Sequence, residues 1–369
     1  MRTRIDDVRG FTRIAIDAAI GGAGIVESMH RTIQRIPAPV GKPIEESTRG
    51  ITGLVYRSVQ GTMRLTGRAL DFGLDQLARR LPDQPVGPQR DRLLARINGL
   101  WGDYLASSNN PLAIDMSLRH EAESSDRVLV LVHGLCMSDH DWLREGHDHG
   151  RRLADDLGYA PVYVRYNSGL PIAENGRALA AELATLVEAW PEPVSEIAFI
   201  GHSMGGLVIR AALHHAERDG ADWTNRVSDL VFLGTPHGGA PLERIGRSID
   251  QALQFSPYLA PFARPGMARS AGITDLRDAR VSADGEPVPL PACIRCYAVA
   301  GRLKAEPAPL RDSTVGDGLV PVASALGLQG DRPLDLPEDR RWISNQTGHF
   351  DLLSRPEVYA QLRSWLDRR

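Results

Sequence analysis

The segment from residue 196 to residue 210 carries the strongest chemical signal in the chain. Within it, Gly201-His202-Ser203-Met204-Gly205 fits the G-x-S-x-G pattern. A short apolar run precedes the pattern, and small and apolar residues at helical spacing follow it, which predicts a buried strand, a sharp turn and a helix. A serine in such a turn has a strained backbone, and a side chain at either glycine would collide with a neighbouring element. The pattern predicts that Ser203 is a nucleophile at the amino end of a helix.

A serine hydroxyl needs a base to take its proton, and the base needs a carboxylate that orients it. In folds with this turn the chain order is serine, acid, histidine. His349 follows the last predicted strands, in a polar loop before the final helix. Asp317, between two glycines, is the predicted acid, and Asp312 is its near rival. The weaker candidates are Asp275 and Asp278, which lie in an insertion, and Asp351, which is expected to cap the final helix.

A tetrahedral intermediate also needs two hydrogen-bond donors for its oxyanion. The amide of Met204, directly after the nucleophile, is predicted to be one of them. The second is expected from the loop after the long apolar strand 127–133, where Gly134 frees the backbone to turn. Leu135 is the predicted donor and Cys136 is the alternative. His133 precedes the nucleophile and is expected to brace this loop, and His202 is expected to point away from Ser203.

The composition of the 369 residues is that of an ordinary soluble protein, with 42% hydrophobic and 24% charged residues. The net charge of −3 gives no reason to expect a nucleic-acid partner. Three cysteines argue against a disulfide framework, and Cys293 and Cys296 are interpreted as two strand residues rather than a metal pair. His147 and His149 are interpreted as polar residues at a helix start, so no metal and no cofactor are predicted.

From about residue 120 the chain alternates strands and helices, which predicts an α/β fold with a mostly parallel sheet covered on both faces. Loops at the carboxyl ends of parallel strands share one edge of the sheet, where sites form. The predicted domain is 120–369. Its residues 240–290 break the alternation, and we interpret them either as a lid over the site or as ordinary surface structure.

Residues 1–119 form a predicted helical region with no chemistry of its own. Three periodic segments, near 14–26, 44–81 and 90–105, predict its helices. They are expected to pack on the catalytic domain or on a partner subunit; the alternative is contact with a membrane surface or lipid droplet, which their arginines and small apolar residues suit. No run of eighteen apolar residues and no good signal peptide is present, so the expected location is cytoplasmic, with peripheral membrane association as an addition.

The chain from about residue 126 to its end resembles the α/β-hydrolase superfamily, and within it the lipase-like hydrolases and the bacterial relatives of the PGAP-type, GPI inositol-deacylase-like group. The motifs that carry the resemblance are 132–135 (Val-His-Gly-Leu), 201–206 (Gly-His-Ser-Met-Gly-Gly), 234–239 (Gly-Thr-Pro-His-Gly-Gly), 316–321 (Gly-Asp-Gly-Leu-Val-Pro) and 348–349 (Gly-His). The resemblance implies Ser203, Asp317 and His349 as the triad. It also implies that His237 shapes a loop beside the site without joining the triad.

The predicted function is a serine carboxylic ester hydrolase that works through an acyl-enzyme, with a lipid-like acyl chain in its substrate. One alternative keeps the triad and changes the bond, as in a thioesterase or an amidase. The other is a binding or scaffold protein on an idle hydrolase fold. The sequence makes no prediction of oligomeric state.

Overall fold

The computed structural model describes residues 4–34, 50–80, 87–120, 125–241, 270–304, 316–329 and 333–367. The chain forms two compact units. The first comprises residues 1–87 with 108–112, and the second comprises 88–107 with 113–369. Helix α3 (Pro88–Ser107) therefore belongs to the second unit although it precedes the predicted boundary near 119, because it buries Leu94, Ile97 and Leu105 there.

A seven-stranded sheet forms the centre of the second unit, in the order β1-β3-β2-β4-β5-β6-β7. Its strands are β1 (Ser117–His120), β2 (Arg127–Val132), β3 (Ala160–Arg165), β4 (Glu196–His202), β5 (Val227–Leu233), β6 (Arg295–Arg302) and β7 (Arg341–Asn345). Strand β1 is antiparallel to β3, and all other neighbours are parallel. The predicted α/β fold class is confirmed, while β7 has no counterpart among the predicted strands.

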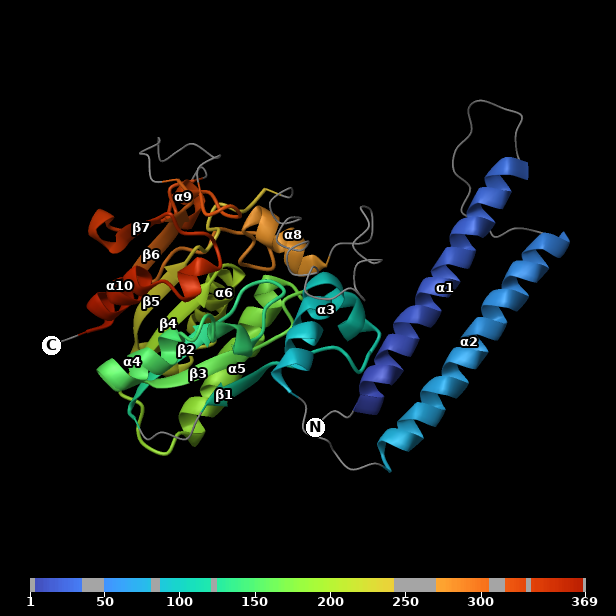
Figure 1. The fold of residues 1–369 in the computed structure, drawn as a ribbon, viewed down its shortest axis with the longest axis horizontal. Helices are drawn as coiled ribbons and strands as arrows, with labels where there is room; N and C mark the ends of the chain where they lie inside the picture. The colour runs from blue at the N-terminus through green and yellow to red at the C-terminus, as the bar shows by residue number, and fades with distance from the viewer. Residues whose placement is uncertain are drawn as a thin grey trace. The chain divides into compact units, whose positions relative to one another are not determined.

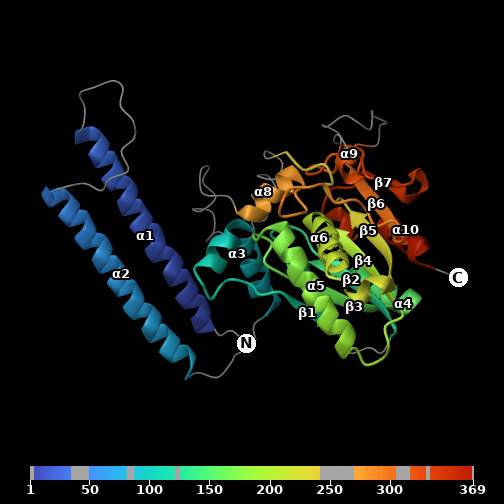
Figure 2. The same cartoon turned by 180° about the vertical axis from the view of Figure 1, so that it is seen from behind.

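Helices cover both faces of this sheet (Figure 1, Figure 2). On one face lie α5 (Ile172–Ala189) and α6 (Met204–Arg218), which pack against each other. On the other face lie α4 (His149–Leu157) and α10 (Pro356–Leu366). The sheet is therefore the middle layer of three. Its inner parallel strands β2 to β6 are buried almost throughout, whereas the edge strand β7 is only partly buried.

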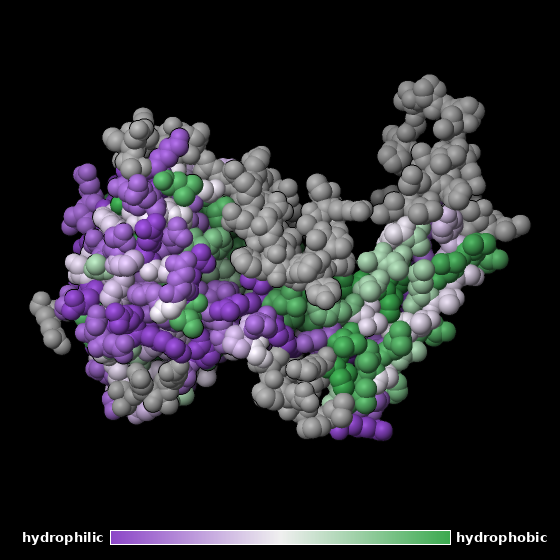
Figure 3. All heavy atoms as spheres, in the orientation of Figure 1, coloured by the Kyte–Doolittle hydropathy of each residue, from purple (hydrophilic) through white to green (hydrophobic). Residues whose placement is uncertain are grey.

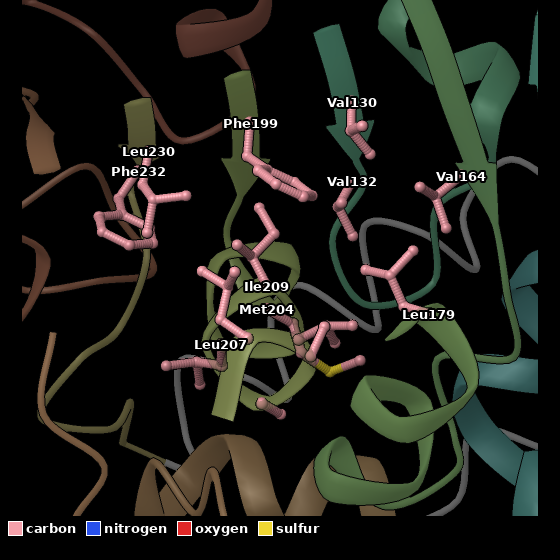
Figure 4. Packing of buried hydrophobic residues seen from close by; sticks show 14 of the residues in the cluster. Val130, Val132, Val164, Leu179, Phe199, Met204, Leu207, Ile209, Leu230 and Phe232 are labelled. Carbon is pink, nitrogen blue, oxygen red and sulfur yellow. The ribbon is translucent and has the colours of Figure 1, made fainter. Parts of the chain in front are cut away.

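The alternation of side chains along the strands supplies both cores. In β2, Val130 and Val132 join the core beneath α5 and α6, whereas Leu129 and Leu131 join the core beneath α4 and α10. Figure 4 shows Val132 and Phe199 of neighbouring strands directed toward Ile209 of α6 and its surroundings. Helix α6 is thereby fixed against the strand that leads into it.

Two short helices follow in the second half of the chain, α8 (Ala271–Asp278) and α9 (Val322–Ala325). Most of the predicted lid insertion, residues 242–269, lies outside the described residues, as does Asp312. The prediction that both cysteines are strand residues is right for Cys296, which is buried in β6. It is wrong for Cys293, which is exposed in the turn before that strand. The first strand residue after the turn is Arg295, two positions past Cys293.

The first unit consists mainly of two long helices, α1 (Arg4–Gln34) and α2 (Gly50–Ala78), which lie side by side (Figure 1). Arg9 near the start of α1 binds Asp71 near the end of α2, and Gln60 of α2 binds Glu27 of α1, so the pair is antiparallel. Among the described residues, no helix is both long enough and apolar enough to cross a membrane.

Candidate active site

Ser203 occupies a strained turn between β4 and α6. Its backbone has φ 54° and ψ −126°, in a region that a residue with a side chain seldom adopts. A Cβ atom at Gly205 would lie 2.1 Å from the carbonyl oxygen of Val132, and one at Gly201 would lie 2.6 Å from the Cα of Gly206. The predicted turn is confirmed, and both of its glycines are required by close approach of backbone.

His349 and Asp317 meet in two loops at the carboxyl ends of the strands. The Nδ1 atom of His349 lies 2.7 Å from Oδ2 of Asp317, and both side chains are buried. A carboxylate only accepts hydrogen bonds, so Nδ1 is the donor, and Nε2 is the ring nitrogen that this contact leaves unused. The other oxygen, Oδ1, accepts the amides of Leu319 at 2.9 Å and Val320 at 2.8 Å. The carboxylate is thereby locked in the direction that orients the ring.

Ser203 and His349 line one pocket in the second unit. Its other lining residues are apolar: Leu135, Met137, Pro236, Ala240, Leu276, Leu319, Val320 and Phe350. They come from the loops after β2 and β5, from α8, and from the two loops that hold Asp317 and His349. The pocket therefore combines one hydroxyl and one imidazole with walls suited to hydrocarbon.

The loop of residues 134–137, here called the oxyanion loop, runs directly over the serine. A Cβ atom at Gly134 would lie 2.9 Å from the Cβ of Ser203. Cys136 has φ 59°, and its amide donates to Oγ of Ser168 at 3.0 Å. That bond removes Cys136 as an oxyanion donor, so of the two amides considered for this loop only Leu135 stays available. Met204 is the first residue of α6, where amides have no acceptor within the helix.

Buried histidines brace the loops around this pocket. His202 has its Nε2 3.0 Å from the carbonyl oxygen of His349, and burial holds its pKa well below the usual value, so the neutral ring donates this bond. The ring of His133 stacks on Tyr166 with 4.3 Å between centroids, and the Tyr166 hydroxyl donates to the His133 carbonyl oxygen. His133 takes the bracing role expected for it, and His202 forms a hydrogen bond with the loop that carries His349. His237 is half-buried beside Arg210, and desolvation of its ring holds its pKa well below the usual value.

The rival acids are engaged elsewhere. Asp275 accepts the amide of Ile172 at the start of α5, and Asp278 pairs with Arg277. The expectation that Asp351 caps the final helix is wrong. Helix α10 begins at Pro356, and Asp351 instead accepts the amide of Gly348 at 2.9 Å. A carboxylate three residues after Gly348 reaches back to tighten the loop that presents His349.

The role of Ser168 as the acceptor of the Cys136 amide is not predicted from the sequence, although the sequence carries a signal for it. Ser168 lies three residues past the end of β3, in the polar pair Asn167-Ser168, and polar residues just after a parallel strand lie at the site edge of such a sheet. The apolar wall residues Leu276 and Phe350 carried no comparable signal, because their segments lack a recognisable period. Within the described residues, no three His, Cys, Asp or Glu side chains are grouped so that they could hold a metal ion. His147 and His149 bind each other, and His149 binds the Leu352 carbonyl oxygen.

The strand order places the serine turn after the central strand β4, and the histidine loop after the last strand β7. This arrangement, with a strained serine turn at the carboxyl end of a central parallel strand, is that of the α/β-hydrolase fold. Residues 123–254 match the family model of the PGAP1-like alpha/beta domain, which confirms the resemblance seen in the sequence motifs. The matched range includes Ser203 and ends before Asp317.

Similarity to individual proteins is distant or short. Over 95 residues the chain is 36% identical to the GPI inositol-deacylase of Schizosaccharomyces pombe. The matched segment covers 26% of this chain and only 7% of that protein. The mature lipase BlEst2 of Bacillus licheniformis matches 68% of this chain and 97% of its own, with 18% identity and a TM-score of 0.47. The esterase Pf2001 of Pyrococcus furiosus matches 69% of this chain and 85% of its own, with 14% identity and a TM-score of 0.43.

Proposed function

We propose that this protein is a serine hydrolase of carboxylic esters. One observation carries the proposal: the imidazole that Asp317 holds at 2.7 Å lines the same pocket as Ser203 in its strained turn. A nucleophile, a base with its accepting nitrogen free, and an orienting carboxylate are the parts that acyl transfer requires. No cofactor enters the proposed reaction.

In the proposed reaction, Oγ of Ser203 attacks the acyl carbon while Nε2 of His349 takes the hydroxyl proton. Asp317 stabilises the imidazolium that forms. The amides of Leu135 and Met204 donate to the oxyanion of the tetrahedral intermediate. Collapse of the intermediate breaks the bond to the alcohol oxygen, which receives the proton from His349. Water then attacks the acyl-enzyme by the same route and releases the carboxylic acid.

The proposed substrate has a lipid-like acyl chain. Eight of the ten residues that line the pocket are apolar, so burial of methylene groups there is favourable by about 0.8 kcal/mol for each. The short match to a protein named GPI inositol-deacylase agrees with the removal of an acyl group. A panel of esters of graded chain length, with matched thioesters and amides, tests both the chain and the bond.

The proposal is tested with Ser203→Ala and with a fluorophosphonate probe. We expect the probe to label Ser203 in the wild type, and the variant to lose label and at least about a thousandfold of kcat. Ser354→Ala, at a half-buried serine outside the pocket that binds Glu145, is the matched control and should leave kcat and labelling unchanged. Turnover near the wild-type rate in Ser203→Ala would refute the assignment, and a wild type that takes no label would favour an idle hydrolase fold.

A further inference from the structure

Helix α2 turns one face toward α1 and leaves the opposite face exposed. The inward residues recur every three or four positions: Gly53, Tyr56, Gln60, Met63, Gly67, Asp71 and Leu74. A Cβ atom at Gly67 would lie 3.1 Å from the side chain of Ile16, which shows how closely the two helices approach. The residues that α1 requires are thus confined to this stripe, and they do not explain the apolar residues on the other side.

The outward face of α2 carries large apolar side chains and no charge. The exposed large apolar residues are Leu54, Val55, Val59, Leu65, Leu70, Phe72 and Leu77. Leu65 is 70% exposed and Phe72 is 66% exposed, which leaves most of each side chain in water. Small uncharged residues such as Thr62 and Ala69 lie between them at helical spacing. Figure 3 shows apolar residues gathered along α1 and α2, where Val8 and Phe11 of α1 are exposed as well.

One edge of this apolar face carries a row of arginines. Arg57, Arg64 and Arg68 are spaced by seven and four residues, so they lie on one line along α2, and all three are exposed. Within the described part of the chain, none of them has an acidic partner. The two aspartates of α2 are taken by other arginines: Asp71 binds Arg9 and Arg13, and Asp75 binds Arg9 and Arg79. The row therefore presents positive charge without local neutralisation.

We propose that the α1–α2 pair binds the surface of an anionic lipid membrane, with α2 lying in the interface. Its outward apolar face would enter the boundary between head groups and acyl chains, and Arg57, Arg64 and Arg68 would bind lipid phosphates. A broad uncharged face bordered by cations is the pattern of a helix that lies on a bilayer. A soluble helix with the same inward stripe would carry charges on its outward face.

The experiment measures binding of the full-length protein to phosphatidylcholine vesicles with and without phosphatidylglycerol, by flotation. We expect binding to the anionic vesicles, weakened by salt. The triple variant R57Q/R64Q/R68Q should lower the partition coefficient about fivefold for each arginine, on the order of a hundredfold in all. The double variant L65E/F72E should lose about a hundredfold or more, because two large side chains no longer leave water. Neither measurement needs a substrate, so neither depends on Ser203 chemistry.

The matched control is R152Q/R177Q/R218Q, which removes the same charge from three exposed arginines of the second unit, here also called the catalytic unit. This variant should bind as the wild type does. Circular dichroism establishes that each variant is folded. The proposal is overturned if the wild type does not float with anionic vesicles, or if L65E/F72E floats as well as the wild type. Equal losses in the control and in R57Q/R64Q/R68Q would also overturn it. Self-association that L65E/F72E abolishes, without vesicle binding, would assign the face to a second copy instead.

Discussion

Helices α2 and α3 both carry apolar residues at helical spacing, yet only α3 buries them deeply. Leu94, Ile97 and Leu105 of α3 are at most 2% exposed, whereas Leu65 and Phe72 of α2 stay largely in water. The glycines differ in the same way. A Cβ atom at Gly99 of α3 would meet Cys136 of the oxyanion loop, but one at Gly61 of α2 would meet nothing within 4 Å. Helix α3 therefore supports the loop beside Ser203, whereas α2 has an exposed apolar face.

Helix α3 contacts the oxyanion loop through backbone as well as side chains. The thiol of Cys136 lies 3.8 Å from the Arg96 carbonyl oxygen, and the backbone of Gly99 lies against Cys136. Leu135, the proposed oxyanion donor, is the neighbour of Cys136. A segment outside the pocket lining can therefore position the loop that carries the proposed oxyanion donor.

Alanine at Gly99 should give the largest effect. Its Cβ atom would lie 2.3 Å from Sγ and 2.9 Å from the backbone nitrogen of Cys136, so the oxyanion loop must shift. Loss of one oxyanion donor lowers kcat by about 10²–10³, and we expect Gly99→Ala to lose about a hundredfold while staying folded. The control is Gly61→Ala in α2, which should keep kcat and gain up to about 1 kcal/mol of helix stability. Wild-type kcat in Gly99→Ala would show that α3 does not position the loop.

The next largest effect concerns acid, which should lower the stability of the second unit at a higher pH than that of the first. His149 is fully buried, and burial lowers its pKa to about 3, so the folded state keeps it neutral where the unfolded state binds a proton. Its contribution is present above the unfolded pKa and is lost as pH falls from about 6.5 toward 3, at up to about 1.4 kcal/mol per pH unit. The pKa of Asp71 in the other unit is lowered by its hydrogen bonds to Arg13 and Arg9, so its contribution is lost only below the ordinary carboxyl range.

Between about pH 6.5 and pH 4.5 we therefore expect the catalytic unit to lose stability while the α1–α2 pair keeps it. Hydrogen exchange of sheet amides and of α2 amides measures the two separately. Urea denaturation of His149→Gln should show a pH slope smaller by one proton than that of the wild type. Earlier acid loss of protection in α2, or an unchanged slope in His149→Gln, would contradict this account.

Local pattern was enough to predict a mostly parallel sheet covered on both faces and the loops that carry Ser203, Asp317 and His349. Each of these depends on a motif that needs only its immediate neighbours, such as the two glycines that flank the serine turn. The hydrogen bond from the Cys136 amide to Ser168, which leaves Leu135 as the proposed second oxyanion donor, joins residues 32 positions apart. No local pattern predicts such a bond. The boundary near residue 119 was misplaced for a related reason: periodicity shows that α3 has an apolar face but not what that face meets.

Charge removal inside the α1–α2 pair should have the smallest effect. Asp71 accepts from Arg9 at 2.7 Å and from Arg13 at 2.5 Å, but all three side chains are partly exposed, at 18–26%, so solvent weakens both pairs. We expect Asp71→Asn to lower protection of α2 amides by about 1 kcal/mol, less at high salt, with kcat unchanged. Arg9 keeps Asp75 at 2.6 Å, which limits the loss. Asp278→Asn, which removes the same charge from the catalytic unit, is the control and should leave α2 protection as it is. If Asp71→Asn lost as much kcat as Gly99→Ala, the contrast between α2 and α3 would be wrong. A change in α2 would then affect the oxyanion loop as strongly as a change in α3.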